Sequence, residues 1–249
     1  MDTNIFQRIQ EIFGKMSENF SILEEQIEID VQISYFEFAS KLKTGSNKEE
    51  LINQQYLLLE ETTPLEKKRE LLVQLAGIEQ VEVFRTLEKY ASNPDEELKQ
   101  WSVLALRESR ALLESSLLDE SKVFISTGLG GKGNKLRYFV LMVSGMDDEY
   151  SDAHKQLIKI ELEDNFKKFK CDIEQINFHE NLITLVILIP MNVSIKDAFR
   201  KGIECSNQYG NLLRKNFIVS NIKIWSIEEI KSQHQFSSFL EGNDDDSDE

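Results

Sequence analysis

The sequence predicts an α+β protein in which a helical half precedes a half built of strands and helices. Two start signals for helices occur 30 residues apart in the first half, and β-prone apolar runs begin after residue 122. With 249 residues, 41% of them apolar and 29% charged, the chain can form a packed core. We therefore predict two domains, residues 1–122 and 123–240, followed by a disordered acidic tail at residues 241–249.

The negative charge is concentrated in the first half and in the tail. The net charge is -15. Residues 1–122 carry 14 Lys and Arg against 24 Asp and Glu, whereas residues 123–240 carry 15 against 14. The tail carries six acids and no base. This distribution excludes a broad phosphate-binding surface and leaves room for a small one in the second half.

Composition also predicts the cellular setting. No apolar run reaches the roughly 20 residues that a membrane helix needs. Two cysteines are too few for a disulfide framework. The first 13 residues have acidic and polar side chains where a secretory signal has basic and then apolar ones. We predict a soluble, cytoplasmic protein with no membrane partner.

Residues 4–43 carry two overlapping patterns. Apolar side chains recur every three or four residues, which is typical of a helix facing a core or a partner helix; they are Ile5, Ile9, Ile12, Met16, Phe20, Leu23 and Ile27. Apolar residues then alternate from Ile27 to Ile33, which is typical of a strand. We predict two helices or one long bent helix, and residues 27–43 stay open between helix and strand.

Two similar start signals follow. Thr63–Glu66 (TPLE) places Thr at the N-cap, Pro at the first helical position and Glu at the third, and Asn93–Glu96 (NPDE) repeats this logic. Gly77 interrupts the apolar stripe after the first signal. Each signal therefore predicts a helix, a short turn and a second helix, and Asn47 opens an earlier helix.

These paired helices resemble the HEAT-type α-solenoid family across residues 47–120. The nearest piece is PDEELKQWSVLALRES at residues 94–109, although the usual arginine of the family is replaced by Lys99 or Gln100 nearby. The resemblance implies stacked helix pairs whose outer surface binds a protein partner. A plain helical bundle is the alternative interpretation.

The second half predicts a β-α-β-β-α-β order. The strands are expected at Val123–Ser126 and Leu136–Ser144 as a hairpin, Ile173–Phe178, Leu182–Pro190 and Phe217–Trp225. Helices are expected after Ser151 and Ser194, and a closing helix after Ser226. This order is the ferredoxin-like plan, in which two helices cover one face of a four-stranded antiparallel sheet.

The segment FHENLITLVILIPMNVSIKDAFRKGI at residues 178–203 resembles the small single-tyrosine transposases of the HUH type in its layout. The two metal-binding histidines of that family correspond here to Leu182 and Thr184, and His179 stands alone. No tyrosine follows Tyr209 to serve as the nucleophile. The resemblance therefore implies a domain that keeps the fold and lacks the catalytic histidines and tyrosine.

The most distinctive motif is a glycine-rich loop. Its backbone N–H groups and neighbouring cations would suit an anion, but a P-loop needs Ser or Thr after its lysine and then a helix. A mobile hairpin tip and a nucleotide site are the alternatives to a loop that contacts a protein or RNA partner. We predict a partner-binding loop formed by Gly128, Gly130, Gly131, Lys132, Gly133, Asn134, Lys135 and Arg137.

A second candidate surface is basic. It comprises Lys196, Arg200, Lys201, Arg214 and Lys215. Tyr209 and Phe217 lie near it in sequence, and bases beside aromatic rings are typical of RNA or single-strand binding. A solvated helix face is the alternative interpretation.

No catalytic, metal-binding or cofactor-binding residue is predicted, because the three histidines are scattered and no enzyme motif is present. The predicted function is a non-enzymatic adaptor that binds a protein partner or macromolecular complex. The alternative is an RNA, single-stranded nucleic-acid or ribonucleoprotein binder. The sequence makes no prediction about oligomeric state.

Overall fold

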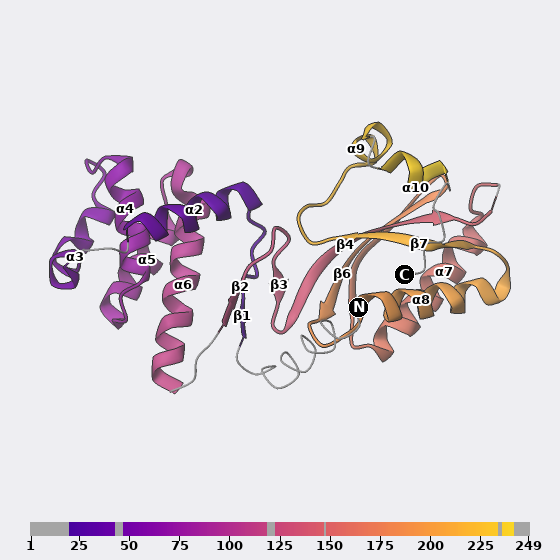
Figure 1. Ribbon diagram of the computed structural model, residues 1–249, viewed down its shortest axis with the longest axis horizontal. Coiled ribbons are helices and arrows are strands. Elements are labelled where there is room, and N and C mark those ends of the chain that lie inside the picture. Colours follow the sequence, from indigo (N-terminus) through magenta and orange to yellow (C-terminus); the bar gives the residue numbers. More distant parts are fainter. Residues whose placement is uncertain (1–19, 43–46, 119–122, 147, 234–235, 242–249) are drawn as a thin grey trace. The chain divides into compact units, whose positions relative to one another are not determined.

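The computed structural model describes residues 20–42, 47–118, 123–146, 148–233 and 236–241 (Figure 1). Mixed helix and sheet confirm the predicted α+β class. The chain divides into two compact units, residues 1–134 and 135–249, whereas we predicted a boundary after residue 122. Among the described residues, no helix is both long and apolar enough to cross a membrane. The predicted acidic tail was residues 241–249: Glu241 is the last residue of a helix, and residues 242–249 lie outside the described residues.

The described part of the first unit is helical apart from three short strands, of which β3 (Gly131–Lys132) lies in the glycine-rich loop. Its helices are α2 (Ile29–Leu42), α3 (Lys48–Gln54), α4 (Leu65–Ala76), α5 (Val81–Ser92) and α6 (Lys99–Leu118), with 3₁₀ turns η1 (Gln55–Leu59) and η2 (Glu96–Leu98). Strands β1 (Phe20–Ile22) and β2 (Val123–Ile125) pair in parallel. Their pairing joins segments about a hundred residues apart in the sequence.

Leucines predominate in the core of this unit, together with other aliphatic side chains and the aromatic residues Tyr35, Tyr90 and Trp101. Fully buried leucines of α4, α5 and α6 face one another; they include Leu71, Leu72, Leu75, Leu87 and Leu104. Tyr35 of α2 packs edge-on against Trp101 of α6, with ring centroids 5.3 Å apart. Its hydroxyl donates to Glu108 Oε2 at 2.8 Å, so α2 is fixed to α6 by packing and by a hydrogen bond.

Several expectations for this unit are confirmed. Residues 29–42 are helical, which decides the open choice between helix and strand. The first start signal opens the α4–α5 pair, and Gly77 ends α4. Asn47 caps α3, with its Oδ1 accepting from the N–H of Glu49 at 3.1 Å. Residues 4–19 of the first predicted helix lie outside the described residues.

Three expectations are wrong. Phe20–Ile22 is a strand, because it pairs with β2. Residues 99–118 form one helix of 20 residues, since neither Gly nor Pro interrupts them. Thr63 does not cap α4: the cap position is Pro64, and the N–H of Thr63 bonds to the carbonyl of Glu60 in the preceding turn.

A buried ion pair connects α4 to the segment between α5 and α6. The Lys68 ammonium lies 2.7 Å from Asp95 Oδ2, and its side chain is only 5% exposed. The Tyr90 hydroxyl donates to the same carboxylate oxygen at 2.7 Å. These two hydrogen bonds, that from Lys68 above all, hold the pKa of Asp95 below its ordinary value.

We expect Asp95→Asn to lower the free energy of unfolding by about 1–3 kcal/mol, because it leaves the buried Lys68 ammonium without a countercharge. Urea denaturation at neutral pH measures the change. The matched control is Glu96→Gln, whose partner Lys99 is 3.9 Å away with both side chains well exposed. The control should change stability by less than about 0.5 kcal/mol. Equal losses in the two variants would contradict the argument.

The second unit contains a mixed α/β layer structure. Its elements are β4 (Lys135–Ser144), α7 (Asp152–Lys168), β5 (Asp172–His179), β6 (Leu182–Pro190), α8 (Ile195–Ser206), η3 (Asn207–Tyr209), β7 (Leu213–Ser220), α9 (Ile227–Ser232) and α10 (Ser237–Glu241). Within this unit the strand order is β7-β4-β6-β5, and all three pairings are antiparallel. Every residue of the central strand β6 is buried.

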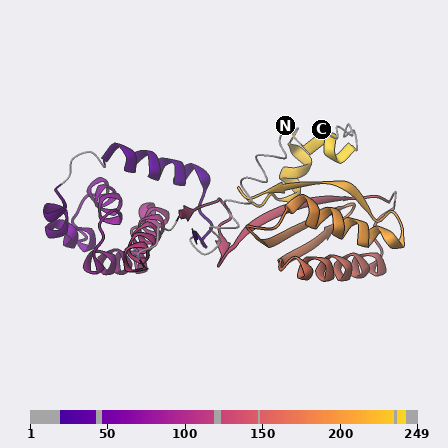
Figure 2. The same cartoon turned by 60° about the horizontal axis from the view of Figure 1, so that its bottom comes forward.

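Both faces of the sheet are covered. Helices α7 and α8 lie on one face, where Phe199 of α8 stacks on Phe217 of β7 with centroids 4.9 Å apart (Figure 2). On the other face, Trp225 packs on Phe139, and Phe236 packs on Trp225. The segment that carries α9 and α10 therefore covers the second face.

The side-chain caps predicted here are confirmed, and two strands are corrected. Ser151 and Ser194 each accept from a backbone N–H of the following helix, and Ser226 forms a full capping box. Val123–Ile125 pairs with β1 and forms no hairpin with β4. The last strand ends at Ser220, before the predicted Trp225, because the chain there leaves the sheet to cover its face.

Candidate binding groove beside the glycine-rich loop

One side of helix α2 carries a largely apolar row that is partly exposed, although the ring of Phe36 meets that of Tyr35 edge-on with centroids 5.2 Å apart. Ile29, Ile33, Phe36 and Ser40 are separated by four, three and four residues, so they lie along one side of the helix. Ile33 is 50% exposed and Phe36 is 38% exposed. They line a shallow pocket of about 470 Å³ together with Gln32, Glu37 and Ser126. We call this pocket the α2 groove.

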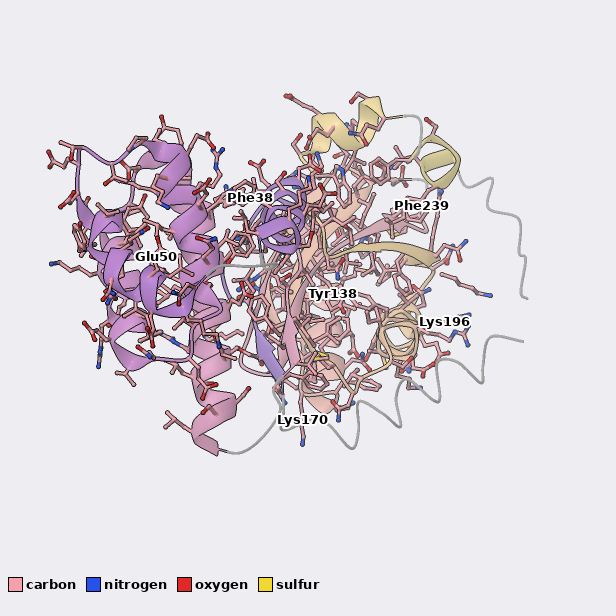
Figure 3. All side chains as sticks on the ribbon, turned by 60° about the vertical axis from the view of Figure 1, so that its left-hand side comes forward. Phe38, Glu50, Tyr138, Lys170, Lys196 and Phe239 are labelled. Atoms are coloured by element: carbon pink, nitrogen blue, oxygen red, sulfur yellow. The ribbon has the colours of Figure 1, made fainter. Side chains whose placement is uncertain are left out.

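The opposite side of α2 already belongs to the core. Tyr35 and Ala39 are buried, and Phe38, labelled in Figure 3, belongs to the same helix. Its ring packs edge-on against Trp101 with centroids 5.5 Å apart. A helix that is apolar on two sides is normally buried on both. In α2, one side meets the core and the other side faces outward.

Helix α2 forms one wall of the groove, and residues 126–127 form the other. The side chain of Gln32 holds this second wall in place. Its side-chain amide is buried and donates to two carbonyls, Ile27 O at 2.8 Å and Thr127 O at 3.1 Å. The second bond spans 95 residues and fixes residues 126–127 beside the first half of α2. Both N–H donors of the amide are used, so the wall is positioned without an unsatisfied polar group.

The glycine-rich loop begins at this wall and is packed at its start. Gly128, Gly130 and Gly131 are buried, whereas Lys132, Gly133 and Asn134 are exposed. Gly130 has φ +66°, and a Cβ there would lie 2.6 Å from the carbonyl oxygens of Glu24 and Glu25. The predicted contact loop is therefore partly a structural element, and only its tip is accessible.

Carboxylates of the chain itself bind three of the groups that we predicted could bind an external anion. The N–H of Gly133 donates to Glu24 Oε1 at 3.3 Å. Lys135 Nζ lies 2.5 Å from Asp172 Oδ2. Arg137 donates to both oxygens of Glu174, at 2.5 and 3.0 Å. Glu24 thus binds the N–H of Gly133 at the tip of the loop, and Asp172 and Glu174 pair with the two cations that follow it.

The predicted basic patch is divided between the two faces of the sheet. Leu213 packs in the core beneath α7 and α8, and Phe217 packs against it from β7, so the alternating Arg214 faces the opposite side. There its guanidinium donates to the carbonyls of residues 239 and 240, at 3.4 and 3.2 Å. Lys201 pairs with Glu204 at 3.2 Å.

The other members of the patch are exposed. Lys196, labelled in Figure 3, and Arg200 are exposed on α8. Lys215 is exposed on β7. Lys196 and Arg200 are four residues apart and share one helical face. The structure thus places three of the five predicted cations, Lys196, Arg200 and Lys201, as exposed groups on one helix, with Lys201 paired to Glu204 of the same helix.

An ion pair holds the segment that Gly130 approaches. Arg107 of α6 donates to both carboxylate oxygens of Glu25. Burial is the largest single influence on the pKa of Glu25 and raises it. The hydrogen bonds from Arg107 and from the backbone, together with the charges of Arg107 and Arg110, outweigh burial, so the pKa lies below its ordinary value of 4.5. The pair therefore fixes the backbone of residues 24–25 against α6.

The histidines, which could bind a metal ion or act in catalysis, are not brought together in the described part of the chain. His154 lies on α7 and His179 at the end of β5, while His234 lies outside the described residues. The described part of the chain holds no group of three His, Cys, Asp or Glu placed to bind a metal ion. Burial raises the pKa of the Cys171 thiol to about 11, so this thiol is protonated at neutral pH.

Comparison with models of known protein families and with curated proteins finds no match for this sequence. The function must therefore be argued from the groove and its surroundings. Sequence reasoning missed Ile33 and Phe36, although their spacing from Ile29 and Ser40 was visible. The alternation from Ile27 to Ile33 obscured that signal.

We expect Gly130→Ala to destabilise the protein by about 1–3 kcal/mol more than Gly133→Ala, because only the first crowds backbone atoms. Both glycines have positive φ, so both variants carry the left-handed penalty of about 1–2 kcal/mol. A Cβ at Gly133 meets no atom within 4 Å. Thermal and urea unfolding of the two variants measure the difference, and equal losses would refute the close approach.

We expect Glu25→Gln to reduce stability at pH 7 and to matter less as the pH falls. A carboxylate with a lowered pKa stabilises the folded state above its unfolded pKa, and this contribution is lost as the pH drops through the folded pKa. The stability gap between wild type and variant should therefore be widest near pH 7 and close below about pH 4. Urea unfolding across this range measures it; a gap independent of pH would contradict the assignment.

Proposed function

We propose that this protein is a non-enzymatic cytoplasmic adaptor whose α2 groove binds an amphipathic helix of a protein partner. The observation that carries the proposal is the outward apolar face of α2, with Ile33 and Phe36 at half or near-half exposure. Singly exposed apolar residues need no explanation, whereas a continuous row beside a preformed wall is typical of a binding surface.

The architecture is compatible with this role. We propose that the first unit is a HEAT-like helical domain, with α4 and α5 as its helix pair. We propose that the second unit is ferredoxin-like, supported by its strand order and by two helices on one face. Leu182 and Thr184, at the positions of the HUH histidines, are buried. HEAT-like and ferredoxin-like folds each host many unrelated functions, so the proposed function rests on the α2 groove and not on the fold.

The groove defines the chemistry of the partner. A helix that fits it presents apolar residues at i, i+3 or i+4, and i+7, as in other helix-in-groove complexes. Glu37 lines the groove and favours a Lys or Arg at the margin of that helix. The acidic surplus of residues 1–122 disfavours an acidic partner at the same place.

A nucleic-acid binder is the second candidate, favoured by one observation. Lys196 and Arg200 are exposed on one face of α8, and Tyr209 is exposed near its end. Two cations beside an aromatic ring can contact a phosphate and a base. The patch is small, because Arg214 binds backbone carbonyls of residues 239 and 240, and the exposed Lys201 is partly neutralised by Glu204 on the same helix.

We expect the double variant Ile33→Glu, Phe36→Glu to lose the partner, with affinity at least about tenfold weaker, because charges in the groove oppose apolar docking. The control is Ile160→Glu on α7, a helical apolar residue of similar exposure at 45%. Affinity capture from native lysate treated with nuclease, followed by quantitative comparison of the three proteins, is the measurement.

Two outcomes would contradict this proposal. If capture is equal for the groove variant and for the control, the groove binds no partner. If nuclease removes every captured protein and Lys196→Ala, Arg200→Ala does the same, the nucleic-acid candidate replaces it.

A further inference from the structure

We propose that the outer edge of strand β5 binds a second copy of this chain. The β5 strands of the two copies pair antiparallel about a two-fold axis at Asn177, and their sheets join into one continuous sheet. This surface lies in the second unit and does not involve the α2 groove. The inference therefore goes beyond the proposed function and does not depend on it.

The outer edge of β5 carries backbone groups without partners. β5 is last in the strand order, and within the described part of the chain it pairs only with β6. Residues 180 and 181 form the turn of the β5–β6 hairpin, so His179 and Leu182 are its hydrogen-bonded closing pair. Bonded pairs alternate along an antiparallel ladder, so the N–H and C=O groups of Ile176 and Phe178 point away from β6. No described residue bonds to these groups.

The regular part of this edge lacks the residues that usually protect an edge strand. Natural edges are blunted by Lys, Pro, bulges or short length. The bulge of β5 is confined to its start, where the register shifts between Ile173 and Gln175. Residues 175–179 (QINFH) follow it and contain no Lys, Pro, Asp or Glu. The strand at the other end of the sheet, β7, carries Arg214 and Lys215 at its own register shift.

Residues 175–179 are complementary to themselves. With Asn177 on the axis, Ile176 lies opposite Phe178 of the second copy, and their outward N–H and C=O groups bond to one another. Both side chains lie on the core face of the sheet, and a β-branched residue opposite an aromatic one stabilises a strand pair. On the other face, where Gln175, Asn177 and His179 are exposed, Asn177 meets its own copy and Gln175 meets His179. Apolar side chains thus face apolar ones, and polar side chains face polar ones.

Other registers of this pairing are poorer. Bonded pairs must join outward-pointing residues, so the alternatives centre on Ile176 or on Phe178. Centring on Phe178 places Ile176 opposite Glu180, which sets a carboxylate beside an apolar side chain. Centring on Ile176 brings the register shift at Glu174 into the pairing, where a bulge disrupts the ladder. The register centred on Asn177 avoids both.

The acidic residues that flank the stretch are paired within their own chain. In the register centred on Asn177, Glu174 of one copy comes closest to Glu180 of the other. Arg137 donates to both oxygens of Glu174, at 2.5 and 3.0 Å. Lys231 Nζ lies 2.8 Å from Glu180 Oε2. These cations reduce the repulsion between the two carboxylates at each end of the pairing.

Sedimentation of the full chain across a concentration series tests the proposal. The average mass should rise toward twice that of one chain as the concentration increases to about 0.5 mM, since a short strand pairing forms a small, weak interface. Asn177→Lys places two ammonium groups face to face at the axis and should weaken dimerisation at least about tenfold. The matched control is Asn216→Lys, the same change at an exposed residue of the opposite edge strand β7. It should weaken dimerisation less than about threefold.

Cysteine cross-linking tests the position of the axis. Asn177 forms a non-bonded pair with its own copy, and such pairs have Cα atoms about 4.5 Å apart, within the range of about 4.4–6.8 Å that a disulfide requires. Mild oxidation of Asn177→Cys should therefore give at least about tenfold more disulfide between chains than oxidation of Asn216→Cys. Both variants also carry Cys171→Ala and Cys205→Ser, which removes the native free thiols.

Three results would overturn the proposal: the mass of one chain at every concentration, equal weakening by the two lysine variants, or equal cross-linking of the two cysteine variants. The variant Ile33→Glu, Phe36→Glu separates the two surfaces and should leave dimerisation unchanged. If it abolishes dimerisation and Asn177→Lys does not, self-association uses the α2 groove and the pairing of β5 is wrong. None of these measurements involves capture of a partner, so failure of the β5 pairing and failure of the proposed function are distinguishable.

Discussion

The buried amide of Gln32 is the interaction on which the candidate site depends. Its two donors bind the carbonyl before α2 and a carbonyl beyond β2, so one side chain joins segments 95 residues apart. An apolar residue at this position would leave two buried carbonyls without these partners, which is costly in a low-dielectric interior. The orientation of α2 about its own axis follows from this bond and from Tyr35. That orientation decides which apolar row faces outward.

Local signals in the sequence predicted the elements whose causes are local. The serine caps of α7, α8 and α9 and the break at Gly77 depend on neighbouring residues only, and all were predicted. The pairing of β1 with β2 depends on residues a hundred positions apart, so Val123–Ile125 was assigned to the wrong partner. The groove was missed for the same reason, because the core side of α2 is chosen by distant Trp101 and Glu108.

The candidate site residues show why charge alone predicts binding poorly. Lys135 and Arg137 are near glycines in sequence, but β6 separates them from β5, and their partners Asp172 and Glu174 reach them across that strand. Arg214 likewise binds carbonyls of residues 239 and 240. No sequence spacing shows such pairings. Cations that serve the fold are therefore indistinguishable, before the structure, from cations that serve a ligand.

An exposed apolar row has two opposing consequences for a soluble protein. It provides the driving force for binding a partner helix, at about 25 cal/mol for each Å² buried, and it equally favours self-association. Glu37 lines the same pocket. A helix with a cation at its margin is therefore favoured over one without it, so charge adds selectivity to a driving force that burial alone would not direct.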